Sequence, residues 1–180
     1  MEPTAKKQDS SLATHGEAGE LQAARTHSRE FESVAESSPD NIIRYDLNCR
    51  AVYINRMLEK TVNVAAASLL GKTPLESRFD GIVGIENYQA KLQQVIATGG
   101  QADVELLAPD PDGNPRTHHV HFAAERDCGG RIIGALAFGR DITQHKMANE
   151  KINHLALYDS LTGLPNRRLL LDRLQHALAS

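Results

Sequence analysis

The sequence predicts an α+β fold, in which a five-stranded antiparallel sheet carries helices on one face and is followed by a linker helix. Segments rich in β-branched and aromatic residues occur first as a pair and later as a group of three, and helical patterns separate the two groups. Within each group, the segments are joined by short stretches dense in turn-forming residues. Consecutive strands can therefore pair as hairpins while the helical insert covers the sheet.

The composition is that of a globular protein. Of its 180 residues, 41% are hydrophobic and 24% are charged, and the formal net charge is −3. No cluster of lysines and arginines stands out, which argues against a nucleic-acid partner. The longest apolar run, residues 132–138, is far shorter than the roughly 20 residues of a membrane-spanning helix. The first residues do not have the pattern of a secretory signal peptide, so we expect a cytoplasmic location without a membrane span.

The N-terminal part divides into a polar tail, a short helix and a hairpin. Residues 1–27 contain few large apolar side chains, so we expect a flexible tail. Apolar residues at helical spacing then predict a helix that ends before Pro39. Two β-rich segments, 41–47 and 51–55, flank a tight turn and predict a hairpin. Residues 56–80 are interrupted by Gly, Pro or Asn, which predicts brief helical turns.

A longer helix and three more strands follow. The helix is predicted over 83–98 by an apolar stripe on one face, and it ends at the pair Gly99–Gly100. Its stripe consists of Ile85, Tyr88, Leu92, Val95 and Ile96. The strands are expected at 102–107, 117–124 and 131–139. We expect the helix to cover the sheet that these strands form.

Residues 143–157 are predicted to form a linker helix. Asp141 and Gln144 have the spacing of a capping box at its start. Along the helix, residues separated by three, four and three positions match the a and d sites of two heptads, as in a coiled coil. These residues are His145, Ala148, Ile152 and Leu155. We therefore expect a homodimer that forms through the globular domain and this helix.

Several landmarks resemble those of a PAS domain. They are SSPDNIIRYD at 37–46, YIN at 53–55, LLGKTP at 69–74 and GRDIT at 139–143. The resemblance covers residues 28–142 and implies a sensor domain of a signalling protein. In such domains the final motif joins the last strand to the output helix. The resemblance therefore implies that Asp141 and Thr143 relay the signal.

Residues 158–180 resemble the N-terminal start of a GGDEF domain, the diguanylate cyclase module, through YDSLTGLPNRR at 158–168. This resemblance implies that the sensor regulates the synthesis of cyclic di-GMP in a longer parent protein. The GG(D/E)EF loop and its metal-binding acidic residues are not among these 180 residues, so we expect no catalytic residue and no cyclase activity in this chain. The sensor of a histidine kinase is the alternative. An apolar stripe at Leu170, Leu171, Leu174 and Leu178 is expected to be exposed or covered by a partner.

The space between the sheet and the longer helix is the expected ligand site. Ligand sites are mostly apolar, with a few polar groups that orient the ligand. The expected lining is Ile43, Tyr45, Tyr53, Tyr88, Leu92, Val120, Phe122 and Leu136. The same residues would form the core of a domain that binds no ligand. A small-molecule sensor and a ligand-free protein-interaction module are therefore both consistent with the sequence.

No certain cofactor or metal site is expected. His119 and His121 share one face of their strand, but no acidic or cysteine partner is fixed near them by the sequence, which favours a solvated surface over a metal site. His118 lies on the opposite face of the same strand, with Phe122. PAS domains that bind haem generally use a histidine on or near the longer helix, which has none here. Cys49 falls in the first hairpin turn, whereas the reactive cysteine of flavin-binding sensors lies on a later helix. Both observations argue against haem and flavin.

Overall fold

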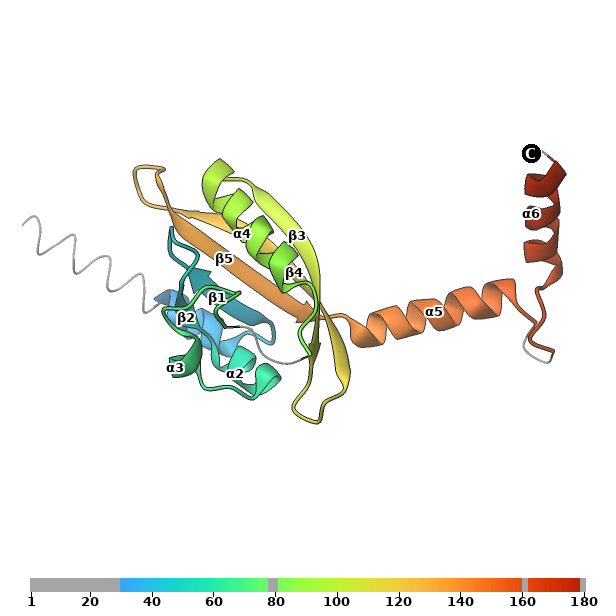
Figure 1. Ribbon diagram of the computed structural model, residues 1–180, viewed down its shortest axis with the longest axis horizontal. Helices are drawn as coiled ribbons and strands as arrows, with labels where there is room; N and C mark the ends of the chain where they lie inside the picture. Colours follow the sequence, from blue (N-terminus) through green and yellow to red (C-terminus); the bar gives the residue numbers. More distant parts are fainter. Residues whose placement is uncertain (1–29, 78–80, 160–161, 179–180) are drawn as a thin grey trace, which may run out of the picture.

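The computed structural model describes residues 30–77, 81–159 and 162–178. Residues 30–37 are helical. The strands are β1 (Asn41–Tyr45), β2 (Ala51–Ile54), β3 (Gln101–Pro109), β4 (Pro115–Arg126) and β5 (Ile132–Asp141). The further helices are α2 (Arg56–Val62), α3 (Ala66–Leu69), α4 (Ile85–Thr98), α5 (Thr143–Leu157) and α6 (Arg167–Leu178) (Figure 1). The tail expected at 1–27 lies outside the described residues.

The strands form one antiparallel sheet in the order β2-β1-β5-β4-β3. The last strand, β5, therefore lies in the centre, between the first strand and the β3–β4 hairpin. In this register Ile43 is opposite Ala137, and His118 is opposite Asp141. The predicted α+β class and five-stranded antiparallel sheet are confirmed.

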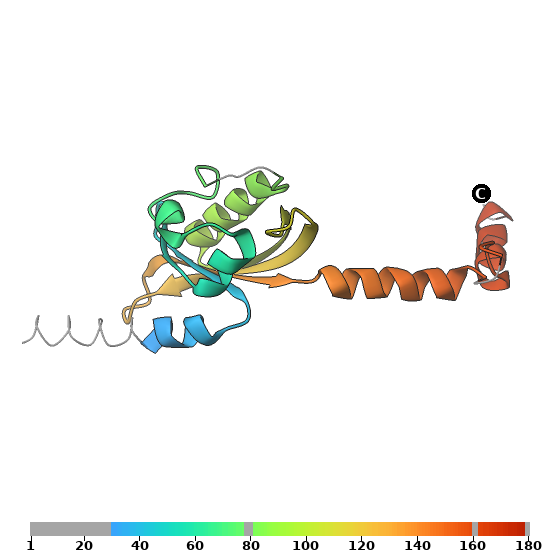
Figure 2. The same ribbon diagram turned by 90° about the horizontal axis from the view of Figure 1, so that it is seen from below.

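The helices α2, α3 and α4 cover one face of the sheet, as Figure 2 shows from the side. The longest of them, α4, buries Ile85, Tyr88, Leu92 and Val95, which lie on the stripe predicted from the sequence. It begins two residues later than predicted because Val83 pairs with Leu107 through two backbone hydrogen bonds. It ends at Gly99, whose φ of 70° suits a residue without a Cβ atom.

The helix at 30–37 lies on the opposite face of the sheet (Figure 2). Asn55, which is fully buried, connects it to the sheet. Its side-chain amide donates to the carbonyl oxygens of Ala35 and Asp40, and its carbonyl oxygen accepts from the backbone N–H groups of Ile42 and Leu58. Asn55 thereby caps α2 and fixes the entry of the chain into the sheet.

The helix α5 extends from the end of β5 away from the sheet, and α6 follows it after a turn (Figure 1). None of the residues of α5 is buried. Within the described ranges, no helix is both long enough and apolar enough to cross a membrane.

Candidate ligand cavity and its junction with the output helix

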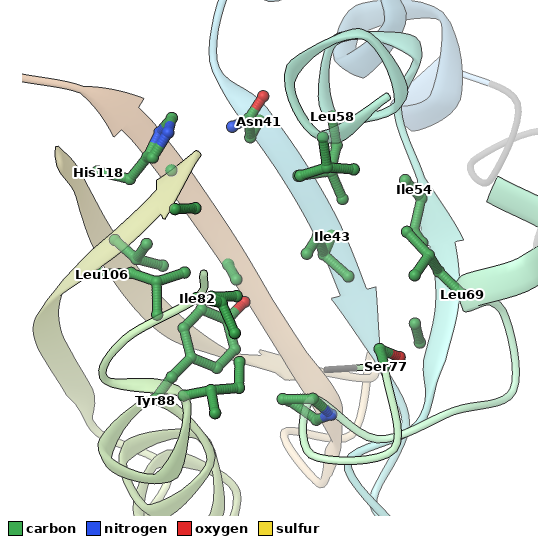
Figure 3. Close-up of a pocket in the computed structure, with 18 of the residues that line it drawn as sticks. Asn41, Ile43, Ile54, Leu58, Leu69, Ser77, Ile82, Tyr88, Leu106 and His118 are labelled. Carbon is green, nitrogen blue, oxygen red and sulfur yellow. The ribbon is translucent and has the colours of Figure 1, made fainter. Parts of the chain in front are cut away.

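A cavity of about 100 Å³ lies between the sheet and the helices that cover it. Figure 3 shows the side chains that reach into it from β1, β2, β4, α2 and α4. The lining residues are Asn41, Ile43, Tyr45, Ala51, Ile54, Leu58, Thr61, Val62, Leu69, Lys72, Pro74, Ser77, Ile82, Ile85, Tyr88, Leu106, Ala108, His118, Val120, Ala137 and Gly139. Most of these side chains are apolar, as in sites for small organic molecules.

The structure places four of the eight predicted lining residues at the cavity, namely Ile43, Tyr45, Tyr88 and Val120. Leu92 and Phe122 do not line it. Both are fully buried in the core that surrounds it. Tyr53 and Leu136 do not line it either, because their side chains lie on the other face of the sheet.

A bulge in β2 accounts for the position of Tyr53. The pairing of β1 with β2 shifts between Arg44 and Tyr45, so that Ala51 is opposite Tyr45 while Tyr53 is opposite Arg44. Because Val52 is an extra residue in the pairing, Ala51 and Tyr53 point to opposite faces of the sheet, although they are two positions apart. The ring of Tyr53 packs against Phe31, 5.6 Å between centroids, and its hydroxyl donates to Glu36.

Leu136 shares the outer face with an ion pair. It is opposite Arg44, whose guanidinium lies 2.6 Å from the Glu125 carboxylate. The cavity side of β5 instead carries the small residues Ala137 and Gly139. The expectation that large apolar residues of β5 face the helices is therefore wrong for Leu136, and the small residues on the inner side leave the space that forms the cavity.

Two tyrosines form a hydroxyl pair at the cavity. The hydroxyl oxygens of Tyr45 and Tyr88 are 3.0 Å apart, and both side chains are buried. Burial raises the pKa of both hydroxyls, so both are neutral at physiological pH. A second polar contact at the lining joins the hydroxyl of Thr61 to the side-chain oxygen of Asn41, at 2.9 Å. These polar groups already have partners.

His118 is one of the polar lining residues that were missing from the predicted set, together with Asn41, Thr61, Lys72 and Ser77. It is only 5% exposed, and its Nδ1 atom has no hydrogen-bond partner among the described residues. Burial lowers its pKa, opposed by the nearby charge of Asp141 and reinforced by that of Arg116, so the imidazole is neutral. The alternation of side chains along β4 places His118 on the same face as Val120 and Phe122. That pattern could have identified His118 as a lining residue from the sequence alone.

The other two histidines of β4 point away from the cavity. His121 Nδ1 lies 3.0 Å from the Asp103 carboxylate, and His119 Nε2 lies 3.4 Å from it. The acidic neighbour that the sequence did not reveal is thus supplied by β3. Across the described parts of the chain, no group of three or more potential ligands is arranged to hold a metal ion.

The start of α5 is hydrogen-bonded to the start of β4. The hydroxyl of Thr143 accepts from the backbone N–H of Thr117 at 2.8 Å, and the N–H of Ile142 donates to the carbonyl of Thr117 at 2.8 Å. The Asp141 carboxylate accepts from the N–H of Thr143 at 2.8 Å. The N-cap is Ile142, without a side-chain cap, so the predicted capping box of Asp141 and Gln144 does not form. Asp141 and Thr143 hold the junction instead.

Apolar side chains are exposed on both C-terminal helices. On α5, Met147, Ile152 and Leu155 are each more than half exposed. On α6, Leu170, Leu171 and Leu174 are each about half exposed. The side chain of Leu178, the fourth residue of the predicted stripe, lies outside the described set.

Two curated proteins are similar to most of this chain. The cyclic di-GMP phosphodiesterase PdeR of Escherichia coli K12 is 27% identical over 154 residues, which are 82% of this chain and 22% of PdeR. The cyclic di-GMP phosphodiesterase PdeB of Shewanella oneidensis is 26% identical over 148 residues, which are 80% of this chain and 16% of PdeB. The chain therefore spans about a fifth of the length of these relatives.

Solved structures share the fold. A Vibrio cholerae VqmA dimer, determined without its target DNA, has a TM-score of 0.55 and 28% identity, over 64% of this chain and 52% of that one. VqmA bound to DPO has a TM-score of 0.55 and 27% identity, over 67% of this chain and 60% of that one. The PAS domain of a Colwellia psychrerythraea protein has a TM-score of 0.52 at 17% identity, and 97% of it is covered.

The similarity to a sequence family is consistent with this fold. The family described as PAS fold matches residues 35–146, which hold the whole sheet, its covering helices and the first turn of α5. This range exceeds half of the chain, and the sheet order and the helical cover agree with it. The chain therefore belongs to the PAS family.

Proposed function

We propose that this chain is a cytoplasmic PAS sensor and dimerisation module, and that its cavity controls an output domain acting on cyclic di-GMP. One observation carries the sensing part of the proposal. His118 at the cavity is opposite Asp141 in the β4–β5 pair, and the adjacent residue Thr117 is bonded to Thr143 and Ile142 at the start of α5. The backbone of β4 that carries His118 is therefore also hydrogen-bonded to the start of the output helix.

This arrangement supports a mechanism based on two packing states. A ligand shifts an equilibrium between two conformations only by its differential affinity for them. A molecule that contacts His118 acts directly on the β4–β5 pairing, and hence on the position of Asp141 and Thr143. The expected output is a change in the direction or rotation of α5. The ion pair between Lys146 of α5 and Glu105 of β3 would re-form or break with that change.

The paired-helix part of the proposal rests on α5. His145, Ala148, Ile152 and Leu155 lie on the exposed surface of a 15-residue helix that contacts little of the domain. Two such helices would bury their Ile152 and Leu155 side chains against each other, as a and d residues do. In a dimer, the geometry of this pair sets how two output domains meet. The known VqmA structure, also a dimer, is consistent with this proposal.

Two lines of support point to cyclic di-GMP. PdeR and PdeB, the two relatives, are cyclic di-GMP phosphodiesterases. In addition, residues 158–168 of this chain resemble the start of a GGDEF domain. Within this segment, the Asp159 carboxylate accepts hydrogen bonds from the backbone N–H and the hydroxyl of Thr162. We propose that the parent protein carries a GGDEF domain after α5 and makes cyclic di-GMP. The relatives favour cyclic di-GMP hydrolysis as the second candidate.

Turnover measurements distinguish these two outputs. The purified parent protein is incubated with GTP and Mg²⁺, and separately with cyclic di-GMP, and the products are quantified by liquid chromatography and mass spectrometry. We expect conversion of GTP into cyclic di-GMP. Hydrolysis of cyclic di-GMP without synthesis would replace the cyclase proposal with the phosphodiesterase one. The absence of both reactions would contradict the proposed role in cyclic di-GMP turnover. The 180-residue chain alone serves as the control and is expected to be inactive.

Two further features of the proposal concern partners. We propose that the sensor binds a small molecule and not haem or flavin, supported by the limited cavity volume of about 100 Å³ and by VqmA, which binds DPO. We also propose that it binds no nucleic acid, supported by its net charge of −3. A ligand-free interaction module is the alternative, and the space at the cavity favours the sensor over it.

A further inference from the structure

The cavity contains an unusual combination of groups. Its walls are mostly apolar, and the hydroxyls of Tyr45, Tyr88 and Thr61 and the side-chain oxygen of Asn41 are hydrogen-bonded to one another or to the backbone. His118 differs, because its Nδ1 atom is buried without a partner in the described structure. A buried polar atom without a partner is destabilising, so a turn of the ring that brings Nδ1 to a partner in the cavity would be favoured.

We propose that the cavity binds a neutral molecule of single-ring size that is apolar over most of its surface and forms one hydrogen bond with Nδ1 of His118. This inference deepens the sensor function proposed above and rests on it. It names the chemical class of the ligand and the residue that recognises its polar group.

The size of the ligand follows from the cavity. An engineered apolar cavity of about 150 Å³ in another protein binds benzene. The cavity of about 100 Å³ here is smaller but of the same order, so a molecule of about single-ring size fills it, and a larger molecule would require the walls to move.

The charge of the ligand follows from the walls. Moving an ionised group into an apolar site is costly unless an opposite charge pairs with it. The buried polar residues of the lining, Tyr45, Tyr88, Asn41 and His118, are neutral. The one cationic side chain of the lining, that of Lys72, belongs to an exposed residue and can remain in water. A neutral ligand therefore fits the buried part of the site.

The position of the polar group follows from Figure 3. His118 and Asn41 reach the cavity from the same end, whereas Leu69 and Ser77 lie toward the opposite end. Asn41 already accepts a hydrogen bond from Thr61. The ligand is therefore oriented with its hydrogen-bonding group toward β4 and the start of α5.

A pair of probes of equal size tests this inference. Phenol and toluene differ by one hydroxyl in place of one methyl group. A wholly apolar cavity prefers toluene, because burying a hydroxyl without a partner is unfavourable. In titration calorimetry on the full chain, we expect phenol to bind more tightly than toluene. The variant His118→Phe keeps a ring but removes its nitrogens. In this variant we expect the affinity for phenol to fall about tenfold relative to the affinity for toluene.

Two variants serve as controls. His119→Phe makes the same chemical change at the next residue of β4, on the opposite face, and should keep the preference of the wild type for phenol. His118→Asn keeps a hydrogen-bonding atom close to the position of Nδ1 and should retain part of that preference. If His118→Phe does not fold, the imidazole ¹⁵N signals of the wild type should shift with phenol but not with toluene.

The possible results separate this inference from the function proposed above. Preference for toluene in the wild type, or a preference for phenol that persists in His118→Phe, would overturn the role of His118. Binding of neither probe would overturn the ligand class. In all of these cases, the role in cyclic di-GMP turnover would still be decided by the activity of the parent protein.

Discussion

Two buried polar residues in this domain have opposite surroundings. Asn55 is fully buried and forms four hydrogen bonds, two through its amide and two through its carbonyl oxygen. His118 is 5% exposed, and its Nδ1 atom has no partner among the described residues. Asn55 joins the N-terminal helix, β1 and α2, whereas His118 borders a cavity.

The difference separates a structural site from a site for a ligand. A buried polar residue whose hydrogen-bonding groups are all paired stabilises one conformation. One with an unpaired atom, in a side chain that borders a cavity, gains stability when a molecule in the cavity provides the missing partner. The side chain of Asn55 is therefore fully paired within the chain itself, whereas we propose that the region around His118 is completed by another molecule.

The largest expected effect of a substitution is at Asn55. Asn55→Ala removes the cap of α2 and leaves several buried backbone groups without partners. We expect the free energy of unfolding to fall by about 3 kcal/mol, as measured by urea denaturation followed by circular dichroism. Asn153→Ala, an exposed position in α5, is the control and should change it by less than about 0.5 kcal/mol. A loss of under 1 kcal/mol at Asn55 would contradict its structural role.

A smaller effect, which depends on pH, is expected at His118. The pKa of its buried imidazole is lowered on folding, so the unfolded chain takes up a proton more readily. Stability is therefore expected to decrease as the pH falls below about 6.5, the value for an unperturbed histidine. In His118→Phe this part of the decrease should disappear, while stability near pH 8 should change by less than about 1 kcal/mol. Urea denaturation at a series of pH values from 8 to well below 6.5 measures both quantities.

The comparison has a matched control in the same strand. His119→Phe alters a partly exposed histidine on the other face, and the variant is expected to lose stability at low pH as the wild type does. If His118→Phe and the wild type lose stability in parallel as the pH falls, the neutral buried imidazole is not the cause.

Periodicity predicted much of this fold. The alternation of β4 placed His118, Val120 and Phe122 on one face, and the apolar stripe located α4 to within two residues at its start. The order of two strands, helices and three strands predicted a five-stranded antiparallel sheet, although not the pairing of β1 with β5. These features depend on local spacing, which the sequence contains directly.

The cavity was less predictable because it depends on departures from simple patterns. The extra residue Val52 turns Tyr53 to the outer face, and a bulge leaves little trace in a short strand. On β5, Ala137 and Gly139 face the cavity while the larger Leu136 faces outward. A prediction that places large apolar residues inside therefore selects the wrong face. The acidic partner of His119 and His121 likewise comes from another strand.

The most direct test of the central claim is whether occupation of the cavity reaches α5. Amide hydrogen exchange of Thr117, Ile142 and Thr143 is measured in the full chain, with and without saturating phenol. The account predicts that phenol changes the exchange of these three amides in the wild type and in His119→Phe, but not in His118→Phe. Unchanged exchange at all three amides while phenol is bound would contradict a link between the cavity and the output helix.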